Sequence, residues 1–149
     1  MGTVAAVAIG LWLTALPGQA PGRGPGAARA QDDPLMAAAR RAARAWQRHD
    51  FSALVAGSPG VLVRLGGAEH STPMPPAQAV LTLRAFAGGA QELQTVVTAV
   101  REVDAGRGYA EVQRTFRAKG TDSRRVQTLY LEWRRTGRVQ RLVEIRVVP

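Results

Sequence analysis

The sequence contains no cysteine, and this absence removes several kinds of site at once. Disulfides, thiolate metal sites, a cysteine nucleophile and a lipid anchor on cysteine are all excluded. Lysine is nearly absent too, since Lys119 is the one lysine among 20 basic residues. The arginines are scattered along the chain rather than gathered in one run. The net charge of +9 therefore predicts a solvated basic surface and no nucleic-acid partner.

Charge is also missing from residues 4–16, which form an apolar run near the start of the chain. Ala28-Arg29-Ala30 follows with small residues at the spacing that a signal peptidase reads, so residues 1–30 are interpreted as a signal peptide and Gly/Pro-rich leader. The run is too short to span a bilayer comfortably, and the Gly/Pro-rich stretch at 17–26 would end any helix. We therefore expect export to the periplasm or the medium, with no membrane anchor on the mature chain of residues 31–149.

Two segments of the mature chain have helical spacing. The first follows Asp33, a favourable N-cap, and ends near His49, with alanines and Trp46 on its apolar face. Residues 49–54 then predict a turn that leads into a short helical piece. The second long segment runs from about residue 76 to residue 87 and stops at a pair of glycines. Between the helices, residues 61–72 have the pattern of a small hairpin.

Alternating apolar and polar residues after the second helix predict four antiparallel strands joined by short turns. They cover Glu92–Val103, Tyr109–Ala118, Arg124–Arg134 and Val139–Val147. With 149 residues, 46% of them apolar, the chain is long enough for one core. The expected fold class is α+β: a curved antiparallel sheet, made of the hairpin and the four-stranded meander, covered on one face by two to three helices.

The turn between the last two strands predicts which side chains face the helices. A three-residue loop, Arg135-Thr136-Gly137, would pair Arg134 with Arg138. One face of this hairpin would then collect Leu129, Leu131, Trp133, Val139, Val143 and Ile145. That face is the one we expect to be buried, since a one-residue slip would mix apolar and polar side chains.

Three stretches resemble the nuclear transport factor 2-like superfamily, which is also called cystatin-like. They are Trp46-Gln47-Arg48-His49-Asp50-Phe51-Ser52-Ala53-Leu54, the second helix with Ala79, Leu83 and Phe86, and the closing Val139-Gln140-Arg141-Leu142-Val143-Glu144-Ile145. Within the superfamily, the chain is most similar to a bacterial domain-of-unknown-function family of short exported proteins. The resemblance covers about residues 33–148. It implies a single cone-shaped domain over residues 31–149, a pocket between sheet and helices, and a homodimer, but no particular activity.

Enzymes of this superfamily usually place an aspartate or histidine inside the cone as a base. All five aspartates here fall in predicted termini or turns, so the sequence assigns no catalytic residue, metal ligand or cofactor. His49, at a charged helix end, is expected to face solvent. We therefore expect a small-molecule-binding or scaffold domain without turnover. The alternative is a small isomerase or hydrolase-like enzyme that uses the same pocket with His70, Tyr130 or Glu132.

Two arginines are predicted on the apolar inner face of the sheet, near Trp133. Arg114 alternates with Val112 and Phe116, and Arg141 lies between two valines. A buried arginine is costly unless it is paired or reaches water. One interpretation is that both pair with a glutamate such as Glu111 or Glu132, or extend to the open end of the cone. The other is that Arg114, Arg141 and Trp133 line a pocket for a small anionic ligand.

Overall fold

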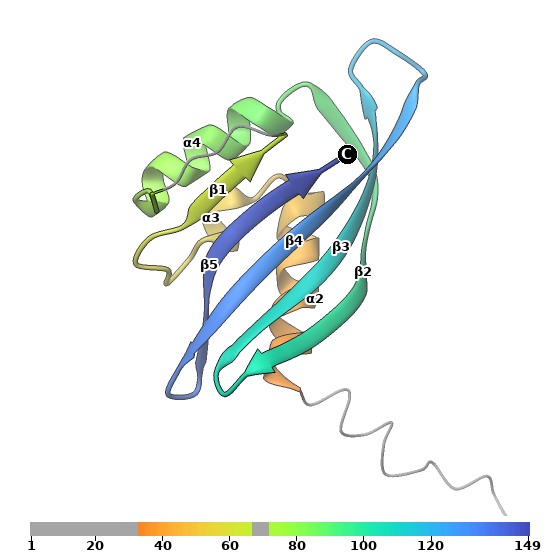
Figure 1. Cartoon of the computed structure of the whole chain (residues 1–149). Coiled ribbons are helices and arrows are strands. Elements are labelled where there is room, and N and C mark those ends of the chain that lie inside the picture. Colours follow the sequence, from red (N-terminus) through yellow and green to blue (C-terminus); the bar gives the residue numbers. More distant parts are fainter. Residues whose placement is uncertain (1–32, 67–71) are drawn as a thin grey trace, which may run out of the picture.

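The computed structural model describes residues 33–66 and 72–149, which form one layer of helices packed on one sheet (Figure 1). The predicted signal peptide and leader (residues 1–30) and His70 lie outside the described residues. The elements in chain order are α2 (Pro34–Gln47), α3 (Phe51–Leu54), β1 (Leu62–Leu65), α4 (Pro76–Ala87), β2 (Ala90–Asp104), β3 (Arg107–Ala118), β4 (Arg124–Thr136) and β5 (Val139–Val148). The α+β fold class predicted from the sequence is confirmed.

Helix α2 begins as its sequence predicts and lies across the inner face of the sheet (Figure 1). The Asp33 side chain accepts a hydrogen bond from the backbone N–H of Leu35 at 2.9 Å, and Pro34 occupies the first turn. The buried face of α2 consists of alanines together with Leu35 and Trp46, which is completely buried. Small alanines bring the helix backbone close to the strands, so α2 contacts β2, β3 and β5.

The five strands form a mixed sheet in the order β1-β5-β4-β3-β2. Three of the four pairings are antiparallel, as expected for a meander. The exception is β1, which pairs in parallel with β5, so that Val63 lies beside Ile145. A parallel pairing is available because α4 and the meander form a long crossover between the two strands. Val61, just before β1, makes an isolated antiparallel bridge to Met74.

The predicted pairing of β4 with β5 is wrong. The loop has two residues, Gly137 and Arg138, and Thr136 pairs with Val139. Gly137 takes a positive φ of 62° at the first loop position, as a type II′ turn requires, whereas Thr136 stays in the strand. As a result Arg134 pairs with Arg141 rather than with Arg138.

A β-bulge restores part of the expected buried face. The register shifts between the pairs Trp133–Leu142 and Glu132–Glu144, which leaves Val143 as an extra residue on β5. The buried side chains of the two strands are Leu129, Leu131, Trp133, Leu142, Ile145 and Val147. Four of them are those predicted, while Leu142 and Val147 take the places expected for Val139 and Val143. Val139 is 54% exposed.

The core lies between α2 and the inner face of the sheet and extends to α3 and α4. Trp46, Phe51 and Leu83 supply its largest apolar side chains. The ring of Trp46 meets that of Phe51 edge to face, with 5.3 Å between centroids. Within residues 33–66 and 72–149, no helix is both long and apolar enough to cross a membrane.

Candidate functional site

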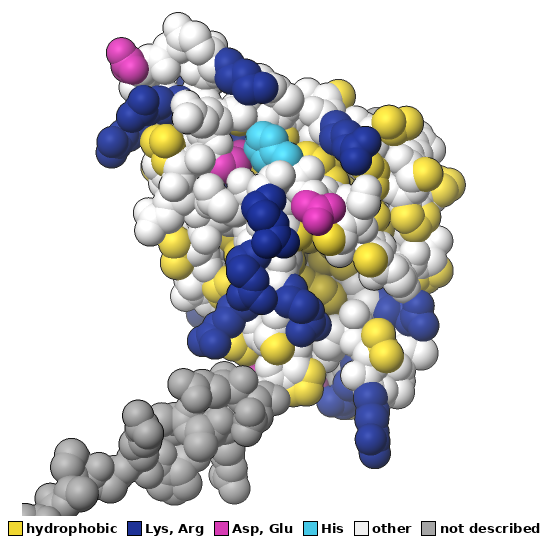
Figure 2. All heavy atoms as spheres, turned by 180° about the vertical axis from the view of Figure 1, so that it is seen from behind, with side chains coloured by type: hydrophobic (Ala, Val, Ile, Leu, Met, Phe, Trp, Pro, Cys, Tyr) yellow, Lys and Arg dark blue, Asp and Glu magenta, His cyan; other side chains and the backbone are white. Residues whose placement is uncertain are grey.

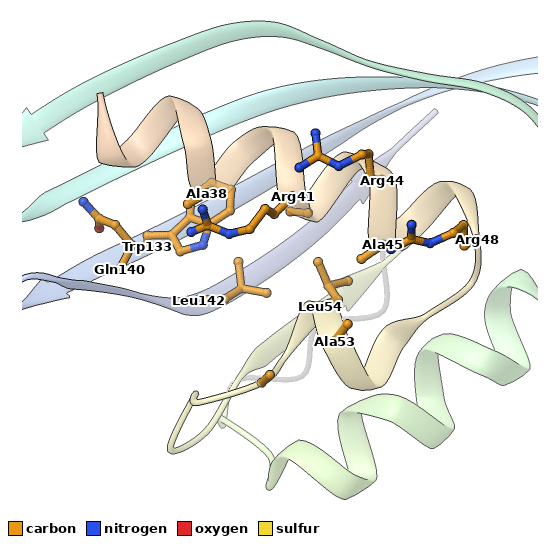
Figure 3. Close-up of a pocket in the computed structure, with 12 residues that line it drawn as sticks. Ala38, Arg41, Arg44, Ala45, Arg48, Ala53, Leu54, Trp133, Gln140 and Leu142 are labelled. Atoms are coloured by element: carbon orange, nitrogen blue, oxygen red, sulfur yellow. The ribbon is translucent and has the colours of Figure 1, made fainter. Parts of the chain in front are cut away.

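A cleft of about 280 Å³ opens between α2, α3 and the β4–β5 hairpin (Figure 3). We call it the arginine cleft. Eight of its twelve lining residues are apolar and three are arginines: Ala38, Arg41, Ala42, Arg44, Ala45, Arg48, Ala53, Leu54, Ala56, Trp133, Gln140 and Leu142. The described part of the lining contains no acidic residue, so the cleft concentrates positive charge in a concave surface.

The three arginines lie along one side of α2 and its C-cap residue, Arg48. Arg41, Arg44 and Arg48 follow one another at intervals of three and four residues, which places them along the same side of a helix. All three are exposed, and none forms a salt bridge with a described residue. Their guanidinium groups are therefore available to an anion.

Alanines on α2 form the floor of the cleft beneath the arginines. Ala38, Ala42 and Ala45 are each at most 6% exposed and pack toward the sheet. The opposite wall comes from the hairpin, where Trp133 on β4 pairs with Leu142 on β5. In Figure 3 the guanidinium group of Arg41 overlaps the indole of Trp133, and Leu142 on β5 and Leu54 on α3 lie across from α2.

The same arrangement is visible on the molecular surface. Figure 2 views the molecule from the side of α2, and dark blue arginine side chains form a row beside a hollow with an apolar, yellow floor. The outward face of α2 also carries Arg40. Arg40 is exposed but does not line the cleft.

Arg114, the first predicted pocket residue, lies in the interior of the cone instead. It is 1% exposed, and its guanidinium group pairs with the carboxylate of Glu92, whose side chain is 2% exposed. Arg114 Nε donates to Glu92 Oε2 at 3.2 Å and Nη2 donates to Oε1, so the pair is bidentate. A third contact joins Arg114 Nη1 to Gln127 Oε1 at 3.4 Å. The inner-face position is thus confirmed, but the partner is Glu92 rather than Glu111 or Glu132.

Aromatic rings surround the same guanidinium group. Its Cζ atom lies 4.0 Å from the ring centroid of Phe116, 5.4 Å from that of Trp46 and 5.8 Å from that of Phe86. Desolvation by burial lowers the pKa of Arg114, while the Glu92 carboxylate acts in the opposite direction. The interior is therefore filled by an ion pair and its aromatic neighbours.

His49 joins this interior pair to the surface. Its Nε2 lies 3.2 Å from Glu92 Oε1, and the imidazole stacks on Phe51 with 5.6 Å between centroids. His49 also has a positive φ of 55°, the one such non-glycine residue in the described chain. The expectation of a solvent-facing histidine holds in part, because the side chain is 31% exposed but also covers the buried carboxylate.

Arg141 is not on the inner face, and this prediction fails with the hairpin register. It pairs with Arg134, and its neighbours Gln140 and Leu142 line the arginine cleft while Arg141 does not. The Arg141 Nη1 atom donates to the carbonyl oxygen of Gly57 in the loop before β1. The side chain thus links the start of β5 to that loop by a hydrogen bond.

The structure does not bring the three predicted pocket residues together. Trp133 lines the arginine cleft, whereas Arg114 pairs across the sheet with Gln127, six residues from Trp133 along β4. At about 3.3 Å per residue, this separates the two positions by roughly 20 Å. The arginines of the cleft were missed as site residues, although Arg41, Arg44 and Arg48 recur in the sequence at helical spacing on the polar side of α2.

Tyr130 and Glu132, candidates for the alternative enzymatic function, lie on the outer face of the sheet. They line a shallow hollow of about 210 Å³ with Tyr109, Glu144 and Arg146. Arg146 Cζ is 4.7 Å from the Tyr130 ring centroid. His70 is outside the described residues. No group of three or more His, Asp or Glu side chains suited to a metal ion occurs within residues 33–66 and 72–149.

No protein-family model and no curated protein matches the sequence. Solved structures do resemble it. A DUF4783 family protein from Bacteroides uniformis has 13% sequence identity, with a TM-score of 0.58 over 72% of this chain and 93% of that one. A ketosteroid isomerase-like protein from Erwinia carotovora atroseptica has 12% identity and a TM-score of 0.60 over 76% and 92%.

Two further solved structures extend this set. An NTF-2-like protein of unknown function from Shewanella oneidensis has 8% identity and a TM-score of 0.56, covering 78% of this chain and 98% of that one. A domain of unknown function with a cystatin-like fold from Nostoc punctiforme has 13% identity and a TM-score of 0.58. Identities this low establish the fold and leave the activity open. The chain has the cone-shaped α+β fold of the nuclear transport factor 2-like proteins, which the sequence predicts.

Proposed function

We propose that this protein is an exported domain that binds a small anion in the arginine cleft, without chemical turnover. The observation that carries the proposal is the row formed by Arg41, Arg44 and Arg48, which lines the cleft and makes no salt bridge with a described residue. Guanidinium groups suit carboxylates and phosphates because they donate two parallel hydrogen bonds.

The lining also supports binding rather than catalysis. Arginine is the only titratable residue type among the described residues that line the cleft. Because the arginine side chain stays protonated, it does not act as a general base in the ordinary pH range. The indole N–H of Trp133 and the carboxamide of Gln140 add neutral hydrogen-bonding groups that orient a ligand.

Binding is tested by titrating the protein with succinate, citrate and inorganic phosphate, followed by calorimetry. Arg44→Met removes the middle guanidinium and is expected to weaken binding of the best anion at least tenfold. Arg40→Met is the matched control, since Arg40 is exposed on the same helix but does not line the cleft. Equal affinities of the parent and Arg44→Met, or no binding of any of the three anions, would sink the proposal.

Export is a separate part of this proposal and rests on the apolar run at residues 4–16 and the cleavage pattern that ends at Ala30. N-terminal sequencing of protein recovered from the periplasm or medium is expected to give Gln31 as the first residue. Recovery of Met1 or Gly2 as the terminus of protein confined to the cytoplasm would contradict it.

A small isomerase or hydrolase-like enzyme is the second candidate, favoured by the contact between His49 and Glu92. A histidine held by a buried carboxylate resembles an oriented general base. His49→Gln separates the two candidates. An enzyme of this kind loses turnover of its substrate in the variant, while the binding domain retains its affinity for anions within twofold.

A further inference from the structure

The ligand class follows from how the arginines are distributed along the cleft. We infer, on the basis of the proposed anion site, that the ligand carries two anionic groups joined by an apolar spacer. Arg41 and Arg48 are seven residues apart, which corresponds to roughly 10 Å along the helix axis. Arg44 lies between them. Two sites of positive charge at the ends of one cleft match two separated anionic groups better than one.

The orientation of the side chains supports this reading. Figure 3 shows the guanidinium groups of Arg41, Arg44 and Arg48 spread along the helix, with that of Arg41 directed toward Trp133. Bringing all three onto a single carboxylate would force like charges together without a described acidic residue of the lining to offset them. A dianion places its two charges at separate points of the row, so the three arginines stay apart.

The lining residues between the arginines are small or apolar and expose little surface of their own. Ala42 and Ala45 occupy the positions beside the arginines on α2, and Leu54 and Leu142 face them. Methyl groups on the helix leave room for a ligand, whereas larger side chains would fill the cleft. These four side chains offer no hydrogen bond to a polar spacer, so methylene groups are favoured.

The volume of the cleft limits the length of the spacer. A volume of about 280 Å³ lies at the low end of small-molecule sites, which favours a small ligand. Straight-chain dicarboxylates of intermediate length, such as glutarate and adipate, are of this size. Malonate is too short to reach two arginines that are two helical turns apart, and much longer chains extend into solvent.

The inference is tested by calorimetric titration with malonate, succinate, glutarate, adipate and suberate. Hexanoate is the monoanion control, because it has the carbon chain of adipate with one carboxylate removed. Affinity is expected to peak at glutarate or adipate, with adipate at least tenfold tighter than hexanoate. Adipate binding is also expected to fall more steeply with salt than hexanoate binding, since two charges are neutralised instead of one.

Variants of Arg41 and Arg48, at the two ends of the row, test whether both anionic groups of the ligand contact the protein. Arg41→Met and Arg48→Met are each expected to weaken adipate at least fivefold, while Arg40→Met changes it less than twofold. All three positions are exposed, so urea unfolding is expected to show folded proteins of near-parent stability.

The outcomes distinguish this inference from the function on which it rests. If hexanoate binds as tightly as adipate, or if affinity is independent of chain length, the two-anion inference is overturned while anion binding in the cleft stands. If no anion binds, or if Arg44→Met binds all of them as the parent does, both fail. If affinity peaks at intermediate length and depends on both Arg41 and Arg48, both are supported.

Discussion

Arginine occupies two contrasting places in this molecule. Arg114 is buried inside the cone, where Glu92 pairs with it and three aromatic rings surround it. Arg41, Arg44 and Arg48 are exposed along α2, and no described acidic residue pairs with them. In the interior, the arginine charge is balanced by a carboxylate of the protein. On α2, the arginine charges have no described carboxylate beside them.

The difference shows that a buried arginine and an arginine available to a ligand have different surroundings. An arginine enters the interior only with a partner, because an unpaired buried charge is too costly to keep. Once paired, it has few donors left for a ligand, and all three nitrogens of Arg114 already contact Glu92 or Gln127. The exposed arginines need no partner for stability, so their donors remain free for an anion.

The largest effect is expected from the interior pair. Glu92→Gln removes the negative charge and leaves the Arg114 guanidinium buried without a counter-ion, which is expected to lower the free energy of unfolding by about 3–5 kcal/mol. Urea unfolding monitored by tryptophan fluorescence gives the value. Arg44→Met in the arginine cleft is the contrasting variant, and a change within about 0.5 kcal/mol is expected there.

A double replacement sharpens the same comparison. Arg114→Met combined with Glu92→Leu removes both charges and fills the site with apolar side chains, so it is expected to be more stable than Glu92→Gln. If Glu92→Gln is as stable as the parent, the charge of Glu92 is not needed to hold Arg114. The contrast between interior and exposed arginines would then be wrong.

An intermediate effect is expected where α2 packs on the sheet and so positions its outward arginines. A side chain at Gly108 on β3 would collide with Leu35 and would place its Cβ 3.1 Å from the carbonyl oxygen of Arg101. Gly108→Ala is therefore expected to destabilise the protein by about 1–3 kcal/mol in urea unfolding. Gly89→Ala is the control, since nothing lies within 4 Å of its added Cβ. Equal stabilities of the two variants would show that α2 can shift without cost.

The strands and helices were predictable because their signals are local. The predicted helix over residues 76–87 is α4, and the four meander strands agree with β2 to β5 within two residues at every end. Alternation of apolar residues depends only on neighbours along the chain, so it survives without knowledge of the partner strand. Asp33 gave the start of α2 for the same reason.

The register of the β4–β5 hairpin and the location of the site were not predictable in this way. A loop shorter by one residue and the extra residue Val143 moved Arg141 off the inner face, and both features depend on pairing across strands. The arginine cleft depends on how α2 meets Trp133 and Leu142, which are about ninety residues further along the chain. The sequence indicated the arginines of α2 but not the wall that they face.

The smallest effect concerns the stability cost of keeping like charges on α2. Arg40 and Arg44 are four residues apart, so they lie one turn apart on the helix and repel each other. Arg40→Glu replaces this repulsion by an attraction, and a gain of about 0.5 kcal/mol in the free energy of unfolding is expected at low salt. At 1 M salt, where the Debye length is about 3 Å, the gain is expected to vanish.

Arg84→Glu on α4 is the control. Arg84 lies in the last helical turn with no charged residue three or four positions away, so its replacement loses a favourable interaction with the helix dipole and destabilises slightly. A gain at Arg40 with a loss at Arg84 would show that the arginines of α2 repel one another, whereas Arg84 interacts favourably with its helix dipole. Equal changes in the free energy of unfolding for Arg40→Glu and Arg84→Glu would show that repulsion between neighbouring arginines on α2 has no measurable cost.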